Sequence, residues 1–220
     1  MQEVARRKQM YKALRWSAFF FVGFLVVTQQ VITNGPLISM DARIANAHRE
    51  NFPNWIDFIF MRVDNLGLRG LTATVLLISA LFISRKFKTW RPLNLAIFSL
   101  LTLNLVVGIL KLVIGRTKPK LNIDLIYAGG LSYPSGHASN ALLTWGVLAY
   151  LLYRYAHIDR YRGRLASAAV LVATFAICVV SLIRNTHWLS DLVGGLFIGA
   201  TLLVIVIAVD RYVPSNSQRS

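Results

Sequence analysis

Two side chains near the C-terminal end of the sequence have the types and spacing of a nucleophile and its partner. His187 and Asp191 are four residues apart, so they share one face if this segment is helical. A carboxylate that accepts a hydrogen bond from an imidazole fixes its tautomer and leaves the other ring nitrogen as a nucleophile or base. A lone histidine with such a partner is more often structural, so the interpretation depends on what lies nearby.

A second histidine follows a turn that suits anion binding. Pro134, Ser135, Gly136 and His137 are consecutive, and serine is a good N-cap at the start of a helix. Free backbone N–H groups at such a start bind anions, and glycine lets a ligand approach the main chain closely. Ordinary helix capping also explains the Ser-Gly pair, so the added histidine is what indicates chemistry.

A cluster of cations precedes this turn. Lys111, Arg116, Lys118 and Lys120 lie within ten residues, and the nearest acid is Asp124. Such a cluster suits a phosphate or diphosphate group, and a surface patch for lipid head groups is the alternative.

A metal site is the main chemical alternative for the two histidines. His137, His187 and Asp191 could form a three-ligand set. His-x3-Asp is a weak metal motif, however, and the surrounding cations would repel a divalent ion. We therefore expect neither a metal nor another cofactor.

The composition indicates that these segments belong to a membrane protein. Hydrophobic residues make up 55% and charged residues 15% of the 220 residues, which excludes disordered and collagen-like classes. A net charge of +15 would suggest nucleic acid in a soluble chain, but here anionic lipid is the better partner. The single cysteine, Cys178, lies in an apolar run, so an intrachain disulfide is excluded.

The apolar runs predict the elements that must position these side chains. A membrane-crossing helix needs about 20 mostly apolar residues. The first run follows a basic stretch but is longer than a signal-peptide core, so we interpret it as a retained helix. The connection over residues 34–67 has one apolar helical face, which predicts a helix lying in the outer interface, and packing on the bundle explains that face equally well. The sequence thus predicts an all-α bundle of six transmembrane helices, over residues 16–33, 68–84, 93–114, 137–155, 165–183 and 188–209.

The distribution of lysine and arginine predicts the orientation of this bundle. Most of them fall in the two terminal tails and in the loops after the second and fourth runs. Both termini are therefore expected in the cytoplasm, with the protein in the plasma membrane. The segments that carry the cations and the two histidines then all face the extracytoplasmic side, where they can converge on one site.

Taken together, these segments resemble the motifs of the type 2 phosphatidic acid phosphatase (PAP2) superfamily. The family pattern is Lys-x6-Arg-Pro, Pro-Ser-Gly-His and Ser-Arg-x5-His-x3-Asp. The sequence has Lys111-x6-Lys118-Pro119, Pro134-Ser135-Gly136-His137 and His187-x3-Asp191. The resemblance implies one six-helix domain over residues 1–213, followed by a flexible tail over residues 214–220.

Two positions depart from the family pattern. Lys118 stands where the family has arginine. The lysine keeps the positive charge but cannot donate the two parallel hydrogen bonds of a guanidinium. Ser181 stands six residues before His187, where the family again has arginine, and the nearest arginine is Arg184. We expect Arg184 to supply the missing guanidinium.

The resemblance also implies roles for the individual residues. His187 would attack phosphorus and form a phosphohistidine, Asp191 would orient His187, and His137 would protonate the leaving oxygen. The substrate would be a membrane lipid phosphate: phosphatidate, phosphatidylglycerol phosphate or polyprenyl diphosphate. A phosphotransferase, or a catalytically weak lipid-phosphate binder or transporter, remains the alternative. The residues expected to bind the phosphate are Lys111, Lys118, Ser135, Gly136 and Arg184.

Overall fold

The structure is a computed structural model that describes residues 2–47, 52–119 and 124–213. The predicted tail over residues 214–220 and the side chain of Lys120 lie outside these ranges. Within them all regular structure is helical, as the sequence predicts. The helices are α1 (Gln2–Ile32), α2 (Pro36–Ala45), α3 (Asn54–Asn65), α4 (Arg69–Lys86), α5 (Arg91–Ile114), α6 (Gly136–Asn140), the π-helical turn η2 (Ala141–Trp145), α7 (Gly146–Arg154), α8 (Arg160–Ile183) and α9 (Leu189–Tyr212).

Four of the described helices, α1, α5, α8 and α9, are long and apolar enough to cross a membrane. Helices α3 and α4 meet the same criterion only as a pair, with a bend of 52° between them. The predicted fourth span corresponds to α6, η2 and α7, which follow one another without a gap but are each short, because a π-turn interrupts the α-helix. Four or five candidate spans are therefore found, and the six-span count stays a prediction.

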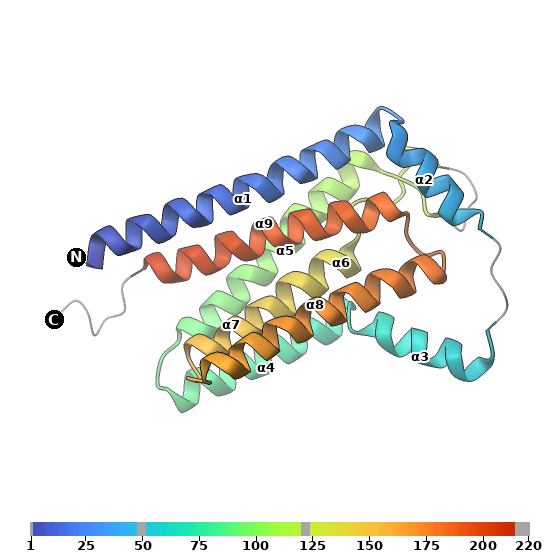
Figure 1. The fold of residues 1–220 in the computed structure, drawn as a ribbon. Helices are drawn as coiled ribbons and strands as arrows, with labels where there is room; N and C mark the ends of the chain where they lie inside the picture. Colours follow the sequence, from blue (N-terminus) through green and yellow to red (C-terminus); the bar gives the residue numbers. More distant parts are fainter. Residues whose placement is uncertain (1, 48–51, 120–123, 214–220) are drawn as a thin grey trace.

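The predicted interfacial helix corresponds to two helices in the first outer connection. Helix α2 packs on α1 and α9, whereas α3 packs on α8 at the end of the bundle (Figure 1). Helix α3 has no buried residue, and Trp55, Phe58 and Ile59 are all exposed. The apolar face predicted from the sequence exists, and its contact with a membrane interface stays a prediction.

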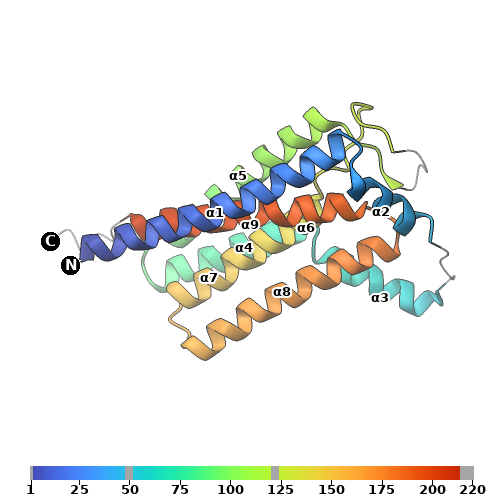
Figure 2. The same cartoon turned by 45° about the horizontal axis from the view of Figure 1, so that its top comes forward.

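Helix α1 lies along α9 over most of its length, as both views show (Figures 1 and 2). Gly23 of α1 makes this approach possible, because a Cβ there would lie 2.6 Å from the ring of Phe197. Helix α5 ends at Gly115, whose φ of 57° turns the chain into the loop that leads to α6. The starts of α6 and α9 thereby lie beside the end of α5.

A carboxylate ties three helices together at the end of the bundle where α1 begins and α9 ends. Asp210 accepts hydrogen bonds from the hydroxyls of Tyr150, at 2.7 Å, and Tyr155, at 2.6 Å. Arg91, at the start of α5, donates to the Asp210 carboxylate at 3.3 Å and to its carbonyl at 2.7 Å. This contact fixes the mutual positions of α5, α7 and α9.

The opposite end of the bundle is held by a fully buried arginine. Arg116 has an exposed fraction of 0%, and its guanidinium contacts the carboxylates of Asp41, Asp124 and Asp191 at 2.6–2.8 Å. Burial alone would lower the pKa of Arg116, but the surrounding carboxylates raise it above its usual value. One further N–H bond goes to the Ser190 hydroxyl at 2.6 Å, so the whole guanidinium fork has acceptors. We call Arg116 and these three carboxylates the Arg116 cluster.

We expect Arg116→Lys to destabilise the protein by roughly 3 kcal/mol. A lysine ammonium cannot donate to all the acceptors arranged around the planar guanidinium, so buried carboxylates would lose hydrogen bonds. The measurement is thermal unfolding of the purified protein in detergent. The control is Arg162→Lys, at an arginine with a 75% exposed side chain that pairs only at the surface. Equal stability of the two variants would contradict a structural role for the cluster.

Candidate active site

The second and third sequence segments meet where α9 begins. The Ser135 N–H donates to the Asp191 carbonyl at 2.9 Å, which joins the turn before α6 to the first turn of α9. Gly195 allows this contact, because a Cβ there would lie 2.6 Å from the Ser135 carbonyl oxygen. The site therefore forms at the end of the bundle opposite the start of α1 (Figure 2).

His187 and Asp191 are in contact, through a geometry that differs from the one expected. The His187 Nδ1 lies 3.3 Å from the Asp191 Oδ2, yet His187 precedes helix α9 and shares no helical face with Asp191. Trp188 is the N-cap of α9, and its N–H donates to the Asp191 carboxylate at 3.2 Å. The capping turn brings His187 back over Asp191, the third residue of α9.

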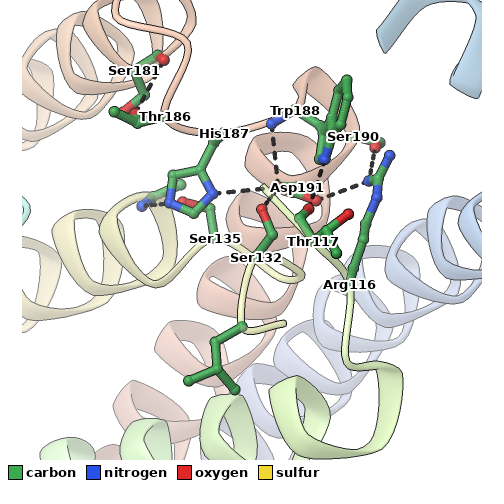
Figure 3. A network of polar contacts seen from close by, with 12 residues as sticks. Arg116, Thr117, Ser132, Ser135, Ser181, Thr186, His187, Trp188, Ser190 and Asp191 are labelled. Atoms are coloured by element: carbon green, nitrogen blue, oxygen red, sulfur yellow. Dashed lines mark hydrogen bonds and ion pairs between the residues drawn. The ribbon is translucent and has the colours of Figure 1, made fainter. Parts of the chain in front are cut away.

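The Asp191 carboxylate is fully buried and saturated with donors (Figure 3). One oxygen accepts from Arg116 at 2.8 Å, and the other accepts from the Ser132 hydroxyl and the Trp188 N–H. An ionised carboxylate only accepts hydrogen bonds, so the proton on His187 is assigned to Nδ1. The Nε2 of His187 is then left with its lone pair.

A pocket of about 260 Å³ brings most of the expected side chains together. The rings of His137 and His187 are 6.1 Å apart, measured between centroids. The Lys111 ammonium donates to the carbonyl of Leu131, which holds it at the pocket wall, and Lys118 is exposed. The pocket is lined by Gly67, Leu68, Arg69, Lys111, Lys118, Leu131, Gly136, His137 and His187.

The position of His137 depends on the start of helix α4. A Cβ at Gly67 would lie 3.1 Å from the Cβ of His137, so a larger residue would press against the histidine. The Asn140 amide donates to the Gly67 carbonyl at 2.9 Å and to the Thr72 hydroxyl at 2.6 Å. These buried bonds fasten α6 to the chain segment that forms the opposite wall.

Ser135 is buried and does not line the pocket. Its hydroxyl accepts from the Ala138 N–H at 3.3 Å, which is the N-cap geometry that the sequence indicated. Its predicted contact with phosphate stays a prediction, as does that of Gly136, which lines the pocket beside the Lys111 side chain.

Arg184 lies beside the pocket and pairs with acids of α3. Its guanidinium is 3.6 Å from the Asp57 carboxylate and 3.7 Å from that of Asp64. Asp64 also accepts from the Ser181 hydroxyl at 3.3 Å and lies 4.0 Å from the Nε2 of His137. Arg184 is not among the residues that line the pocket, so its binding of phosphate stays a prediction.

Sequence reasoning missed several side chains that shape this site. They were missed because their partners lie on distant segments. The only signal for the acids among them was that the chain has just nine Asp and Glu, several of them in the outer connections. Within the described residues, no group of three or more His, Cys, Asp or Glu side chains is placed to hold a metal ion. The missed residues are Asp41, Asp64, Arg69, Ser132 and Ser190.

Comparison with known proteins identifies the family. Residues 92–214 match the family model of the PAP2 superfamily, which is more than half of the chain. The curated protein "Phosphatidylglycerophosphatase B" of Bacillus subtilis (strain 168) is 26% identical over 213 residues, which cover 96% of this chain and 100% of that protein.

A solved structure shares the fold. The crystal structure of the first transmembrane PAP2 type phosphatidylglycerolphosphate phosphatase from Bacillus subtilis superposes with a TM-score of 0.80 at 22% identity. The superposition covers 91% of this chain and 98% of that one. The resemblance that the three motifs carry is thus confirmed: the chain belongs to the PAP2 superfamily and, with its long apolar helices, is an integral membrane protein.

Proposed function

We propose that this protein is a membrane lipid phosphatase that hydrolyses phosphatidylglycerol phosphate through a phosphohistidine. The observation that carries the proposal is the contact between His187 and Asp191 at a pocket that also holds His137 and three cations, Arg69, Lys111 and Lys118. The name of the Bacillus subtilis relative supports this lipid over phosphatidate and polyprenyl diphosphate, the other substrates that suit the same pocket.

In the first step, the Nε2 of His187 attacks phosphorus, so a P–N bond forms as the bond to the lipid oxygen breaks. His137 gives its proton to the departing oxygen. Asp191 remains ionised and stabilises the positive imidazole ring, because Arg116 and Ser132 already hold the carboxylate in place.

In the second step, His137 takes a proton from water, and the hydroxide attacks the phosphohistidine. A P–O bond to the hydroxide forms as the P–N bond breaks, the electron pair of that P–N bond returns to the Nε2 of His187, and inorganic phosphate leaves. Lys111 and Lys118, with Arg69, which sequence reasoning missed, neutralise charge on the phosphoryl oxygens in both steps. No metal or other cofactor takes part in this scheme.

The helix lengths support six spans for this function. Helix α4 has 18 residues and would cover about 27 Å, while α6, η2 and α7 have 5, 5 and 9 residues and together cover about 28 Å. Both lengths are close to the roughly 30 Å of a bilayer core. With six spans in the plasma membrane and cytoplasmic termini, the pocket opens on the extracytoplasmic face.

A catalytically weak lipid-phosphate binder is the second candidate, favoured by the ion pairs of Arg184 with Asp57 and Asp64. These pairs neutralise the guanidinium that would otherwise serve the phosphate. A phosphotransferase would differ from the phosphatase by releasing no free phosphate in the absence of an acceptor, and from the binder by transferring phosphate when an acceptor is present.

We expect purified protein to release phosphate from phosphatidylglycerol phosphate faster than from the other two lipids, and EDTA to leave the rate unchanged. His187→Ala should lower the rate by about 10³-fold or more, because no other group replaces its nitrogen. His157→Ala, at the far end of the bundle, is the matched control. Loss of activity with EDTA and rescue by zinc would instead support a metal enzyme, and an active His187→Ala would exclude the phosphohistidine.

We expect Arg184→Ala to lower kcat/KM by on the order of 10²-fold, through loss of a charge-assisted contact in the transition state. Because Ser181 and Arg184 both contact Asp64, an arginine at either position can reach the same region. The double variant Ser181→Arg, Arg184→Ala should therefore regain activity. Arg43→Ala, an exposed change at the same end, is the control. If Arg184→Ala keeps the wild-type kcat/KM, then Arg184 serves only to hold α3.

The orientation is tested by cysteine labelling. Leu131→Cys, at a half-exposed residue of the pocket rim, should react with a membrane-impermeant thiol reagent in intact cells. Trp90→Cys, exposed at the other end of the bundle, should react only after lysis. The native Cys178 is buried, so its background labelling should be low. The reverse pattern would place the pocket in the cytoplasm.

A further inference from the structure

A second cleft lies at the opposite end of the bundle from the two histidines. Its volume is about 660 Å³, and its walls come from η2, α7, α8 and α9. Tyr150 and Tyr153 of α7 face Gly163 of α8 across it, and Leu203 and Ile207 of α9 close its side. None of these residues takes part in the chemistry proposed above.

This cleft combines apolar walls with three positively charged lining residues. Arg160 and Arg164, in the first turns of α8, and Arg211, at the end of α9, all line it, whereas no aspartate or glutamate does. Arg211 also lies over the ring of Tyr150, with 5.4 Å from its guanidinium carbon to the ring centroid, which aims it toward α7. Three guanidinium groups at the rim of one cleft favour a bound anion.

The cleft continues into an apolar groove between α8 and α9. The groove has a volume of about 540 Å³, and Leu142, Leu171 and Leu203 line both spaces. Its other lining residues, among them Phe175 and Phe197, are almost all apolar. Basic groups at the end of a membrane helix and an apolar channel beside them match the two parts of an anionic phospholipid.

We propose that this cleft binds an anionic glycerophospholipid as a structural ligand, with its phosphate among Arg160, Arg164 and Arg211 and an acyl chain in the groove between α8 and α9. Such a lipid joins two helices whose main partners differ. Helix α8 packs on α3, α7 and η2, whereas α9 packs mainly on α1 and α6. The bound lipid fills the space between them and screens the repulsion among the arginines.

This lipid differs from a substrate molecule by its position. The rise along α8 from Arg164 to Ile183 is about 28 Å, and the pocket with His137 and His187 lies beyond the far end of that helix. A phosphate held at Arg164 therefore stays out of reach of His187. The inference does not depend on the catalytic mechanism.

The test uses the full chain in nanodiscs of phosphatidylcholine, with and without phosphatidylglycerol as the probe. Native mass spectrometry should detect retained phosphatidylglycerol, and thermal unfolding should shift to higher temperature with it. The triple variant Arg160→Gln, Arg164→Gln, Arg211→Gln should lower retention by about tenfold or more. The double variant Arg160→Gln, Arg164→Gln, which keeps the contact of Arg211 with Tyr150, should show a smaller loss in the same direction.

The matched control removes the same charge from the same end, away from the cleft: Arg85→Gln, Lys88→Gln, Arg162→Gln, all at exposed residues. It should retain phosphatidylglycerol as the wild type does. Ala168→Trp, which fills the exposed wall of the cleft, should lower retention without any loss of charge. The far-ultraviolet circular dichroism spectrum should match that of the wild type in all variants, which shows that they fold.

Two results would overturn the proposal. If the control and the triple variant lose the lipid equally, the attraction is that of a general basic surface. If soluble glycerol phosphate displaces the lipid at equal concentration, then the groove contributes nothing and the cleft is only an anion site.

Discussion

The site depends on the burial of one positive charge. Arg116 is fully enclosed, and a guanidinium without partners there would cost several kcal/mol. Asp41 from α2, Asp124 from the loop and Asp191 from α9 supply those partners, so three separate segments must meet around it. Because Asp191 also holds His187, the same cluster that closes the end of the bundle sets the position of the proposed nucleophile.

A second carboxylate, that of Asp64, lies beside His137, the proposed general acid, much as Asp191 lies beside His187. It lies between His137, Ser181 and Arg184, and it belongs to the short helix α3 outside the main bundle. The serine that replaces the family's arginine thus donates to a carboxylate that the nearby Arg184 neutralises. The departure from the family motif and the acids of α3 are therefore one arrangement, in which Arg184 pairs with Asp57 and Asp64 and Ser181 donates to Asp64.

The two ends of the bundle use positive charge differently. At the pocket end, Lys111 is held by backbone carbonyls and Arg116 by carboxylates, so these cations are fixed in direction. At the other end, Arg160 and Arg164 line an apolar cleft without acids. Fixed cations suit a reaction centre, where donors must be aligned before the charge develops, whereas cations at an apolar cleft suit the head group of a bound lipid.

The sequence by itself determined the all-helical class and proposed the residues of the candidate site, because both inferences depend on short-range patterns. Apolar runs of sufficient length form membrane helices whatever their neighbours, and the motif spacing places His137 and His187 at helix starts. Only the tertiary structure decided the partners of Arg116, since Asp41 and Asp191 are each 75 residues away in the chain. It also decided that Asp64 of α3 lies beside His137, because such contacts depend on how whole helices pack and leave no mark in local spacing.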